Sequence, residues 1–172
     1  MTSMVNSKGV IFREVQRFNQ LWVWLFILLA TAGTWYAAIV QILLKKPVGE
    51  NPAPDLVIVI LWFVLGLAFP LLFYYAKLIT EVRYDGLYFC YFPFHLSFRK
   101  ISWAEIKKYE ACTYRPLREY GGYGIRHSRH GKAYNVSGNK GVKLELFNGK
   151  KILIGSQRPA ELVKAIDTAL GK

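Results

Sequence analysis

LWVWLFILLATAGTWYAAIVQILL, residues 21–44, and LVIVILWFVLGLAFPLLFYYA, residues 56–76, are two apolar stretches that contain no charged residue. At about 1.5 Å of rise per helical residue, each stretch is long enough to cross a hydrocarbon core of about 30 Å. A short link at 45–55, rich in proline, joins them. We therefore expect a hairpin of two transmembrane helices, over 21–44 and 56–79, with a short extracytoplasmic loop at 45–55.

A secretory signal is the alternative explanation for the first stretch. Basic residues precede it, and Ala30-Thr31-Ala32 resembles a signal-peptidase cleavage site. The apolar stretch nevertheless continues through Trp35 to Leu44, well beyond the apolar core of a signal peptide. We therefore expect an uncleaved anchor.

Small residues in both stretches would allow the two helices to pack closely. They are Ala30, Gly33, Thr34 and Ala37 in the first stretch and Gly66 in the second. Pro70 follows Gly66 by one turn and should kink the second helix. Because neither stretch holds an ionisable Asp, Glu, Lys or Arg, we interpret the kink as a packing feature and not as the gate of an ion pathway.

Residues 1–20 form a polar lead-in. Within it, Ile11, Phe12, Val15 and Phe18 would share one face of a helix. The segment fits an amphipathic helix at the level of the lipid headgroups, and it equally fits the frayed start of the first transmembrane helix.

The formal net charge of +12 is concentrated in the C-terminal part of the chain, where 17 Lys/Arg stand against 8 Asp/Glu from Thr80 onward. Residues 1–20 hold three basic residues and one acid, whereas two lysines and two acids balance in 45–55. Since cytoplasmic segments are enriched in Lys and Arg, we expect a multi-pass protein of the cytoplasmic (inner) membrane with both termini in the cytoplasm. The excess charge could attract nucleic acid or anionic lipid, since both present phosphate, and the membrane spans favour lipid. A solvated basic surface is the equal alternative.

From Thr80 the apolar residues recur with a period of two, which is typical of β-strands. The expected strands are Thr80–Tyr84, Leu87–Phe94, Leu96–Ser102, Ile106–Thr113, Gly124–Arg126, Ala133–Val136, Val142–Phe147 and Lys151–Gly155. Asp85-Gly86 and Asn148-Gly149 are typical hairpin turns. A helix beginning at Pro159 has one apolar face. We expect an α+β domain over 80–172, in which this helix plugs a half-open antiparallel β-barrel.

Several segments of this domain resemble the bacterial pleckstrin-homology-like (PH-like) domains. They are Asp85-Gly86, Ile101–Ile106, Gly141–Leu146 with Asn148–Lys150, and Ile154-Gly155 followed by Arg158–Leu162. Together with residues 120–126 and 133–136, they make the chain similar to uncharacterised prokaryotic proteins in which two membrane spans precede such a domain. The resemblance implies a seven-stranded barrel capped by a C-terminal helix, and it implies no activity.

The candidate binding residues are basic. PH domains that bind inositol phosphates usually place cations in their first hairpin loop, which the sequence places at the short turn Asp85-Gly86, so a deep pocket of that type is not expected. The basic residues gather instead at Arg115, Arg118, Arg126, Arg129 and Lys132. If the loop that carries the last three faces a bilayer, it could hold anionic headgroups; solvated loop charge is the equal alternative.

No motif indicates catalysis or a cofactor. His127 and His130 are spaced like metal ligands, but no Cys, Asp or Glu lies near them and cations surround them. Gly121, Gly122 and Gly124 do not form a nucleotide-binding pattern. We expect no catalytic residue, no metal and no cofactor.

The resulting hypothesis is a non-catalytic, membrane-anchored PH-like module that binds another membrane protein or an anionic lipid surface and thereby assembles or regulates a complex. The alternative is a small accessory subunit of a larger transport or secretion assembly, contacted through the two helices. An enzyme that acts on lipid is a third reading. The sequence leaves open whether the chain forms homo-oligomers.

Overall fold

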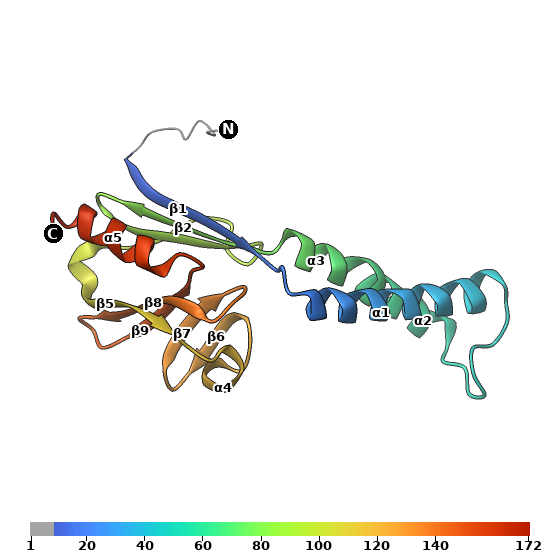
Figure 1. Cartoon of the computed structure of the whole chain (residues 1–172). Helices are drawn as coiled ribbons and strands as arrows, with labels where there is room; N and C mark the ends of the chain where they lie inside the picture. The colour runs from blue at the N-terminus through green and yellow to red at the C-terminus, as the bar shows by residue number, and fades with distance from the viewer. Residues whose placement is uncertain (1–8) are drawn as a thin grey trace. The chain divides into compact units, whose positions relative to one another are not determined.

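A computed structural model of the chain describes residues 9–172, which divide into two compact units. One unit is Phe18–Ala76, and the other joins the strand Val10–Arg17 to Lys77–Lys172. In Figure 1, where colour follows residue number, β1 comes first, then the helices of the helical unit, and then the remaining strands. The helical unit is thus inserted into the sequence of the sheet-containing unit, directly after its first strand.

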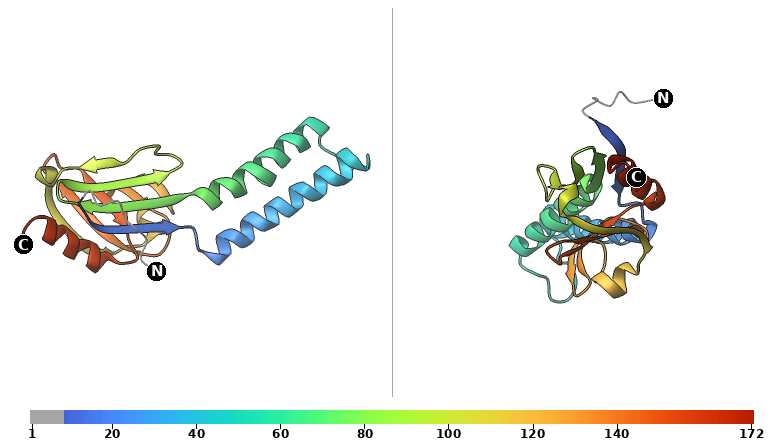
Figure 2. Two further views of the ribbon diagram at one scale, coloured as in Figure 1. Left: turned by 90° about the horizontal axis from the view of Figure 1, so that it is seen from above. Right: turned by 90° about the vertical axis from the view of Figure 1, so that its left-hand side faces the viewer.

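The helical unit is a hairpin of two long helices, seen side by side in Figure 2. Its segments are α1 (Leu21–Ala38) with the π-helical η1 (Ile39–Leu43), then α2 (Asp55–Leu61), the π-helical η2 (Trp62–Ala68) and α3 (Phe69–Tyr75). Both helices, Leu21–Leu43 and Asp55–Tyr75, are long and apolar enough to cross a membrane, with mean hydropathies of 1.9 and 2.9. The two predicted apolar helices are therefore confirmed.

The second helix changes to π-helical geometry just before Pro70. Pro70 has no N–H, so the carbonyls of Gly66 and Leu65, four and five residues earlier, lose the donor that an ordinary residue 70 would supply. Side chains of the first helix replace it: Trp35 Nε1 donates to the Gly66 carbonyl at 3.2 Å, and Thr31 Oγ1 donates to the Leu65 carbonyl at 3.2 Å. Such replacement is what allows a proline inside an apolar helix.

The small residues contribute unequally to the hairpin contact. A Cβ added to Gly66 would lie 3.1 Å from Thr34 Oγ1, so the two helices approach closely there. A Cβ added to Gly33 would meet nothing within 4 Å. The side of the first helix that carries Gly33 is therefore not used in packing within the hairpin.

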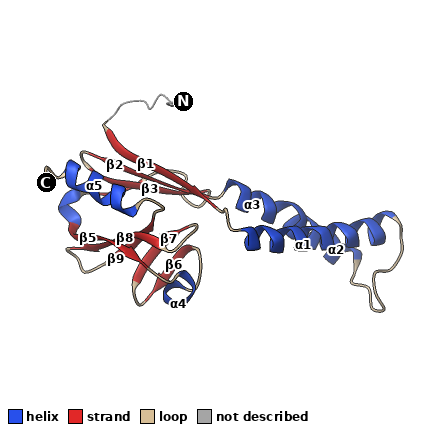
Figure 3. Ribbon diagram, in the orientation of Figure 1, coloured by secondary structure: helices blue, strands red, loops and turns tan. Residues whose placement is uncertain are grey.

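The sheet-containing unit has two sheets in the described residues, drawn as separate layers in Figure 3. A four-stranded antiparallel sheet has the order β1-β2-β3-β4, and a five-stranded mixed sheet has the order β5-β8-β9-β7-β6. The strands are β1 (Val10–Arg17), β2 (Lys77–Arg83), β3 (Gly86–Phe92), β4 (Arg99–Ile101), β5 (Ile106–Thr113), β6 (Gly124–Ser128), β7 (Gly131–Asn135), β8 (Lys140–Leu146) and β9 (Lys151–Gly155). The helical segments are η3 (Trp103–Glu105), α4 (Pro116–Tyr120) and α5 (Pro159–Ala169).

Each strand expected after Thr80 has a counterpart here, with ends shifted by a few residues. The apolar face predicted for the C-terminal helix is buried through Leu162, Ala165 and Ile166, and α5 contacts strands of both sheets. The barrel is not closed: in residues 9–172 no strand of one sheet pairs with a strand of the other, and β7 pairs parallel with β9. The α+β class is confirmed, with two sheets in place of a barrel.

The helical interpretation of the lead-in was wrong for its described part, because Val10–Arg17 forms β1. Its inward positions are Phe12, Glu14 and Gln16, which alternate as a strand requires. Pairing with β2, whose Ile79 lies opposite Val15, overrides the apparent helical spacing. Residues 1–8 of the predicted lead-in lie outside the described residues.

Glu14 connects β1 to the segment between β9 and α5. Its buried carboxylate accepts hydrogen bonds from Ser156 Oγ at 2.5 Å and from the Gln157 backbone N–H at 2.7 Å. Gln16 Nε2 donates to Glu14 at 3.2 Å and to the Gly155 carbonyl at 2.7 Å. A buried carboxylate with several donors is a specific connection, so β1 is an integral part of the unit.

Candidate anion-binding site

A groove of about 600 Å³ lies where the β6–β7 turn meets the β8–β9 turn. Within the described part of the chain, its lining includes four cations and no carboxylate. The cations are Arg129, Lys132, Lys150 and Lys151. We call this feature the basic groove.

The parallel pairing of β7 with β9 brings the two turns together. Lys132 pairs with Ile152, so the two strands begin at the same end of the sheet and the turns before them are neighbours. Gly131 makes this close approach feasible: its φ is +108°, and a Cβ there would lie 2.3 Å from the Lys151 carbonyl oxygen. Only glycine combines this backbone conformation with this contact.

The charges of the basic groove are not neutralised by the protein. Across residues 9–172, none of its four cations has a carboxylate within 4 Å. Lys132 Nζ lies 5.2 Å from the centre of the Tyr134 ring, and Arg129 Nε is 3.4 Å from His130 Nε2. Lys151 stands opposite Glu145 in the pairing of β8 with β9, but the groove as a whole presents net positive charge to solvent, which attracts anions.

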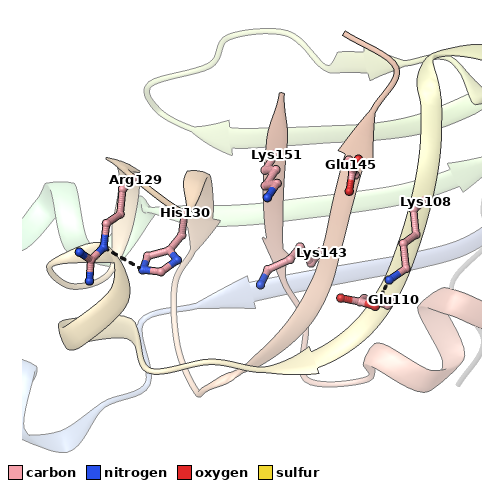
Figure 4. A pocket seen from close by; sticks show the side chains of 7 residues that line it. All are labelled: Lys108, Glu110, Arg129, His130, Lys143, Glu145 and Lys151. Carbon is pink, nitrogen blue, oxygen red and sulfur yellow. Dashed lines mark hydrogen bonds and ion pairs between the residues drawn. The ribbon is translucent and has the colours of Figure 1, made fainter. Parts of the chain in front are cut away.

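A second groove of about 260 Å³ shares Arg129 and Lys151 with the first (Figure 4). It contains two carboxylates. Lys108 Nζ lies 2.9 Å from Glu110, and Lys107 Nζ lies 3.0 Å from Glu145; these hydrogen-bonded lysines hold the pKa of each carboxyl below its usual range.

Lys143 lies between the two sides of this second groove in Figure 4, and it stands opposite Glu110 in the pairing of β5 with β8. The positive and negative side chains that line the second groove therefore alternate across neighbouring strands, as on an ordinary solvated sheet face. The basic groove, in contrast, has no carboxylate in its lining.

Comparison with curated proteins gives no match, and comparison with solved structures gives none either. A family model matches residues 4–172, almost the whole chain. The chain belongs to DUF6141, a family of unknown function. The DUF6141 match includes both the helical hairpin and the two sheets, so the family is defined by the two units together.

The five basic residues expected from the sequence of this DUF6141 chain are divided by the fold. Arg129 and Lys132 line the basic groove, whereas Arg115, Arg118 and Arg126 are not among its lining residues. Arg115 directly precedes α4 and Arg118 lies within it, whereas Arg126 donates from Nε to the Tyr123 carbonyl at 2.9 Å.

Lys150 and Lys151 complete the groove but were missed in the sequence. Gly149-Lys150-Lys151 is visible there only as a turn, and nothing local indicates that β9 pairs parallel with β7.

His127 and His130, the two histidines that are spaced like metal ligands, are not brought onto one site. His127 lines the basic groove, and His130 lines the second groove. In the described residues, no group of three or more His, Cys, Asp or Glu side chains could hold a metal ion. The chemistry that the basic groove offers is charge-assisted hydrogen bonding to phosphate or carboxylate oxygens.

Proposed function

We propose that this chain is a non-catalytic, membrane-anchored PH-like module whose basic groove binds the headgroups of anionic lipids, and that this binding helps to assemble or regulate a complex at the membrane. The observation that carries the proposal is the acid-free groove of four unpaired cations on a domain whose sequence contains a long apolar hairpin. Acidic headgroups are the anions that such a domain would meet at highest concentration.

Exposure of the helices supports anchoring in a membrane. Only 6% and 11% of the most apolar windows of the two helices are buried, whereas a core helix of a soluble protein would be mostly buried. The Lys/Arg excess from Thr80 onward supports a cytoplasmic position for both termini, because the link between the helices has no such excess. We accordingly place the chain in the cytoplasmic membrane.

The strand order supports the PH-like assignment in part. A four-stranded antiparallel sheet, a second sheet and a C-terminal helix follow one another as in such domains. If β1 is the first strand of a PH-like domain, Asp85-Gly86 joins its second and third strands, and the membrane hairpin itself is the first loop. The place where PH domains usually hold inositol phosphates would then be taken by the anchor, and headgroup binding would pass to the basic groove.

The expected binding energy is modest and depends on salt. A Lys or Arg near an anionic membrane surface contributes about 1 kcal/mol, so four cations contribute on the order of 4 kcal/mol. Since the Debye length is about 8 Å at physiological ionic strength, added salt should weaken the binding. This energy is enough to orient a domain that is already tethered, but it would not recruit a free protein strongly.

The test uses the full chain in nanodiscs of neutral phosphatidylcholine, mixed with vesicles that contain phosphatidylserine, and measures co-flotation at low and at physiological salt. The groove variant replaces Arg129, Lys132, Lys150 and Lys151 with Gln. The matched control replaces Arg115, Arg118, Arg126 and Lys164 with Gln, so it loses the same charge outside the groove. We expect the groove variant to lose flotation and the control to keep most of it; equal losses would show that binding follows net charge alone and would overturn the proposal.

A second candidate is an accessory subunit that contacts a larger membrane assembly, or a second copy of itself, through the helices. It is favoured by the unused side of the first helix, where a Cβ on Gly33 would meet nothing within 4 Å. Photocrosslinkers at positions 33 and 37 that capture a membrane protein would support this candidate. Crosslinks confined to lipid would not.

A further inference from the structure

We propose that the loop between β3 and β4, residues 93–98, inserts its apolar side chains into the headgroup region of the bilayer. Phe94 is 62% exposed and Leu96 is 90% exposed, and Phe98 is also exposed. Side chains of this size are rarely left so open together on one short loop of a soluble domain. We call residues 93–98 the aromatic loop; the inference rests on the proposed membrane anchoring and is independent of the basic groove.

The aromatic loop is held in place by His95. This side chain is buried between Phe89 and Tyr134, with ring-centre distances of 6.2 and 5.6 Å. The His95 backbone N–H donates to the Tyr91 carbonyl at 2.8 Å, and His95 Nδ1 accepts the Tyr91 N–H at 3.3 Å. Because His95 is fixed inward, its neighbours Phe94 and Leu96 point outward, so their exposure is set by the fold.

The register of β2 and β3 places the aromatic loop at the end of the sheet where the chain connects to the hairpin. Lys77 pairs with Phe92, the residue directly before the loop. Lys77 follows Tyr75, the last residue of the second long helix, by two residues, which span at most about 7 Å. Because Tyr74 and Tyr75 are suited to the membrane interface, chain connectivity alone keeps the base of the loop within reach of the headgroups.

Charge favours lipid over a protein as the occupant. Arg17 and Lys77 stand opposite each other at this end of the sheet, and Arg99 follows the loop directly. In residues 9–172 none of the three has a carboxylate within 4 Å. Exposed aromatic and aliphatic side chains with unpaired cations beside them are the composition of segments that lie in the interface of an anionic bilayer. The tether adds a high effective concentration of lipid.

The experiment places an environment-sensitive fluorophore on single cysteines of the full chain, reconstituted in nanodiscs at one chain per disc. The background carries Cys112→Ser; Cys90 is buried, and the background alone should take up no label. The labelled variants are Leu96→Cys in the aromatic loop, Tyr84→Cys in the β2–β3 turn and Leu29→Cys in the first helix. Leu29 is 74% exposed and Tyr84 is 69% exposed, so both comparison positions are open to the label, as Leu96 is. Tyr84 is the control for the domain surface, because Lys77 pairs with Phe92 at one end of β2 and Arg83 pairs with Gly86 at the other end, next to Tyr84.

Lipids brominated near the carbonyl end or near the methyl end of their acyl chains then report depth by quenching. We expect position 96 to shift to the blue and to be quenched mainly by the shallow bromines, because interfacial segments penetrate about 5–10 Å. Position 29 should be quenched mainly by the deep bromines, and position 84 by neither.

Each other outcome decides between the proposals. If position 29 is quenched but position 96 behaves like position 84, the anchor stands and the loop insertion is overturned. If position 96 shifts to the blue without quenching by either lipid, a protein surface covers it, which also overturns the inference. If position 29 is not quenched, the membrane anchoring itself fails, and the inference fails with it.

Discussion

Arg17 stands directly opposite Lys77 in the antiparallel register of β1 and β2, although the entire helical hairpin separates them in the sequence. The hairpin thus takes the place of a turn between two paired strands. The chain segments on either side of it must lie on one side of any membrane that the hairpin crosses, since both belong to one sheet.

This pairing predicts the labelling pattern of the full chain in inside-out and right-side-out membrane vesicles. Cysteines introduced at Val15, on β1, and at Phe147, on the β8–β9 turn, should react with a membrane-impermeant reagent from the same side, which our proposal identifies as the cytoplasm. A cysteine at Glu50, between the helices, should react only from the other side. Labelling of positions 15 and 147 from opposite sides would contradict the pairing of β1 with β2.

Replacing Glu14 with Ala should destabilise the sheet-containing unit by about 1–3 kcal/mol, because the buried donors of Ser156, Gln157 and Gln16 would lose their shared acceptor. The measurement is the free energy of unfolding of the full chain in mild detergent, followed through aromatic fluorescence during a urea titration. Glu161→Ala is the matched control: its carboxylate is exposed and pairs with Arg158 at 3.1 Å, so its loss should cost less than about 1 kcal/mol. Equal costs would mean that β1 is not integrated as described.

Thr31→Val should weaken the hairpin by about 0.6 kcal/mol, the usual size of a hydrogen bond between helices in a membrane. The effect should shrink in a Pro70→Ala background, because residue 70 would then supply its own N–H to the second helix. The measurement is the free energy of unfolding in mixed micelles of mild detergent and dodecyl sulfate, for the original chain, each single variant and the double variant. Thr34→Val is the control, since that hydroxyl bonds to carbonyls of its own helix at 2.9 and 3.2 Å. Additive effects of Thr31→Val and Pro70→Ala would show that the two residues are not coupled.

Gly131→Ala should both destabilise the sheet-containing unit and reduce binding at the basic groove. The added Cβ would lie 2.3 Å from the Lys151 carbonyl oxygen, so β7 and β9 would have to separate. Gly149→Ala offers a comparison, because Gly149 has a φ of +79° but open space around it. In that variant, the alanine in the left-handed region should lower the free energy of unfolding by only about 1–2 kcal/mol, and vesicle binding should persist. Similar behaviour of the two variants would refute the role of the close approach.

Stability should fall in mild acid through His95. Burial, together with the nearby charges of Arg99 and Lys132, lowers the pKa of His95 below 6.5. The unfolded chain therefore binds a proton at a pH where the folded chain does not, and the free energy of unfolding decreases as the pH falls from 6.5 toward the folded pKa. Urea titrations between about pH 7 and about pH 5.5 measure this slope. His95→Gln should flatten it, and an unchanged slope in that variant would assign the effect to other groups.

The parts of the fold that the sequence predicts well are those with local periodicity. The charge-free stretches around Leu25 and Ile60 and the alternation of Val142, Leu144 and Leu146 each indicate their structure within a few neighbouring residues. β1 does not, because the strand points Glu14 and Gln16 inward. The hydrogen-bond partners of those polar side chains lie at residues 155–157, and no local sequence pattern predicts a contact between segments so far apart in the chain.

The candidate site was predictable only on one of its two sides. Arg129 and Lys132 are visible as part of a basic run, whereas Lys150 and Lys151 reach the same groove through the parallel pairing of β7 with β9. Parallel pairing depends on contacts between segments distant in sequence, so the residues it brings together cannot be listed from the sequence alone. Arg115 and Arg118, close to the run in sequence, lie at α4 and outside the groove.

The insertion of the hairpin between β1 and β2 also sets an order of events during synthesis. Because chains emerge from the ribosome N-terminus first, β1 is made before either helix, whereas β2 and Ser156 are made after both. The donors of Ser156 and Gln157 reach Glu14 only after the last strands have been translated. If the hairpin crosses a membrane as we propose, β1 can pair with β2 only when both helices have inserted and returned the chain to the side on which it started, so completion of the sheet-containing unit would depend on correct insertion of the anchor.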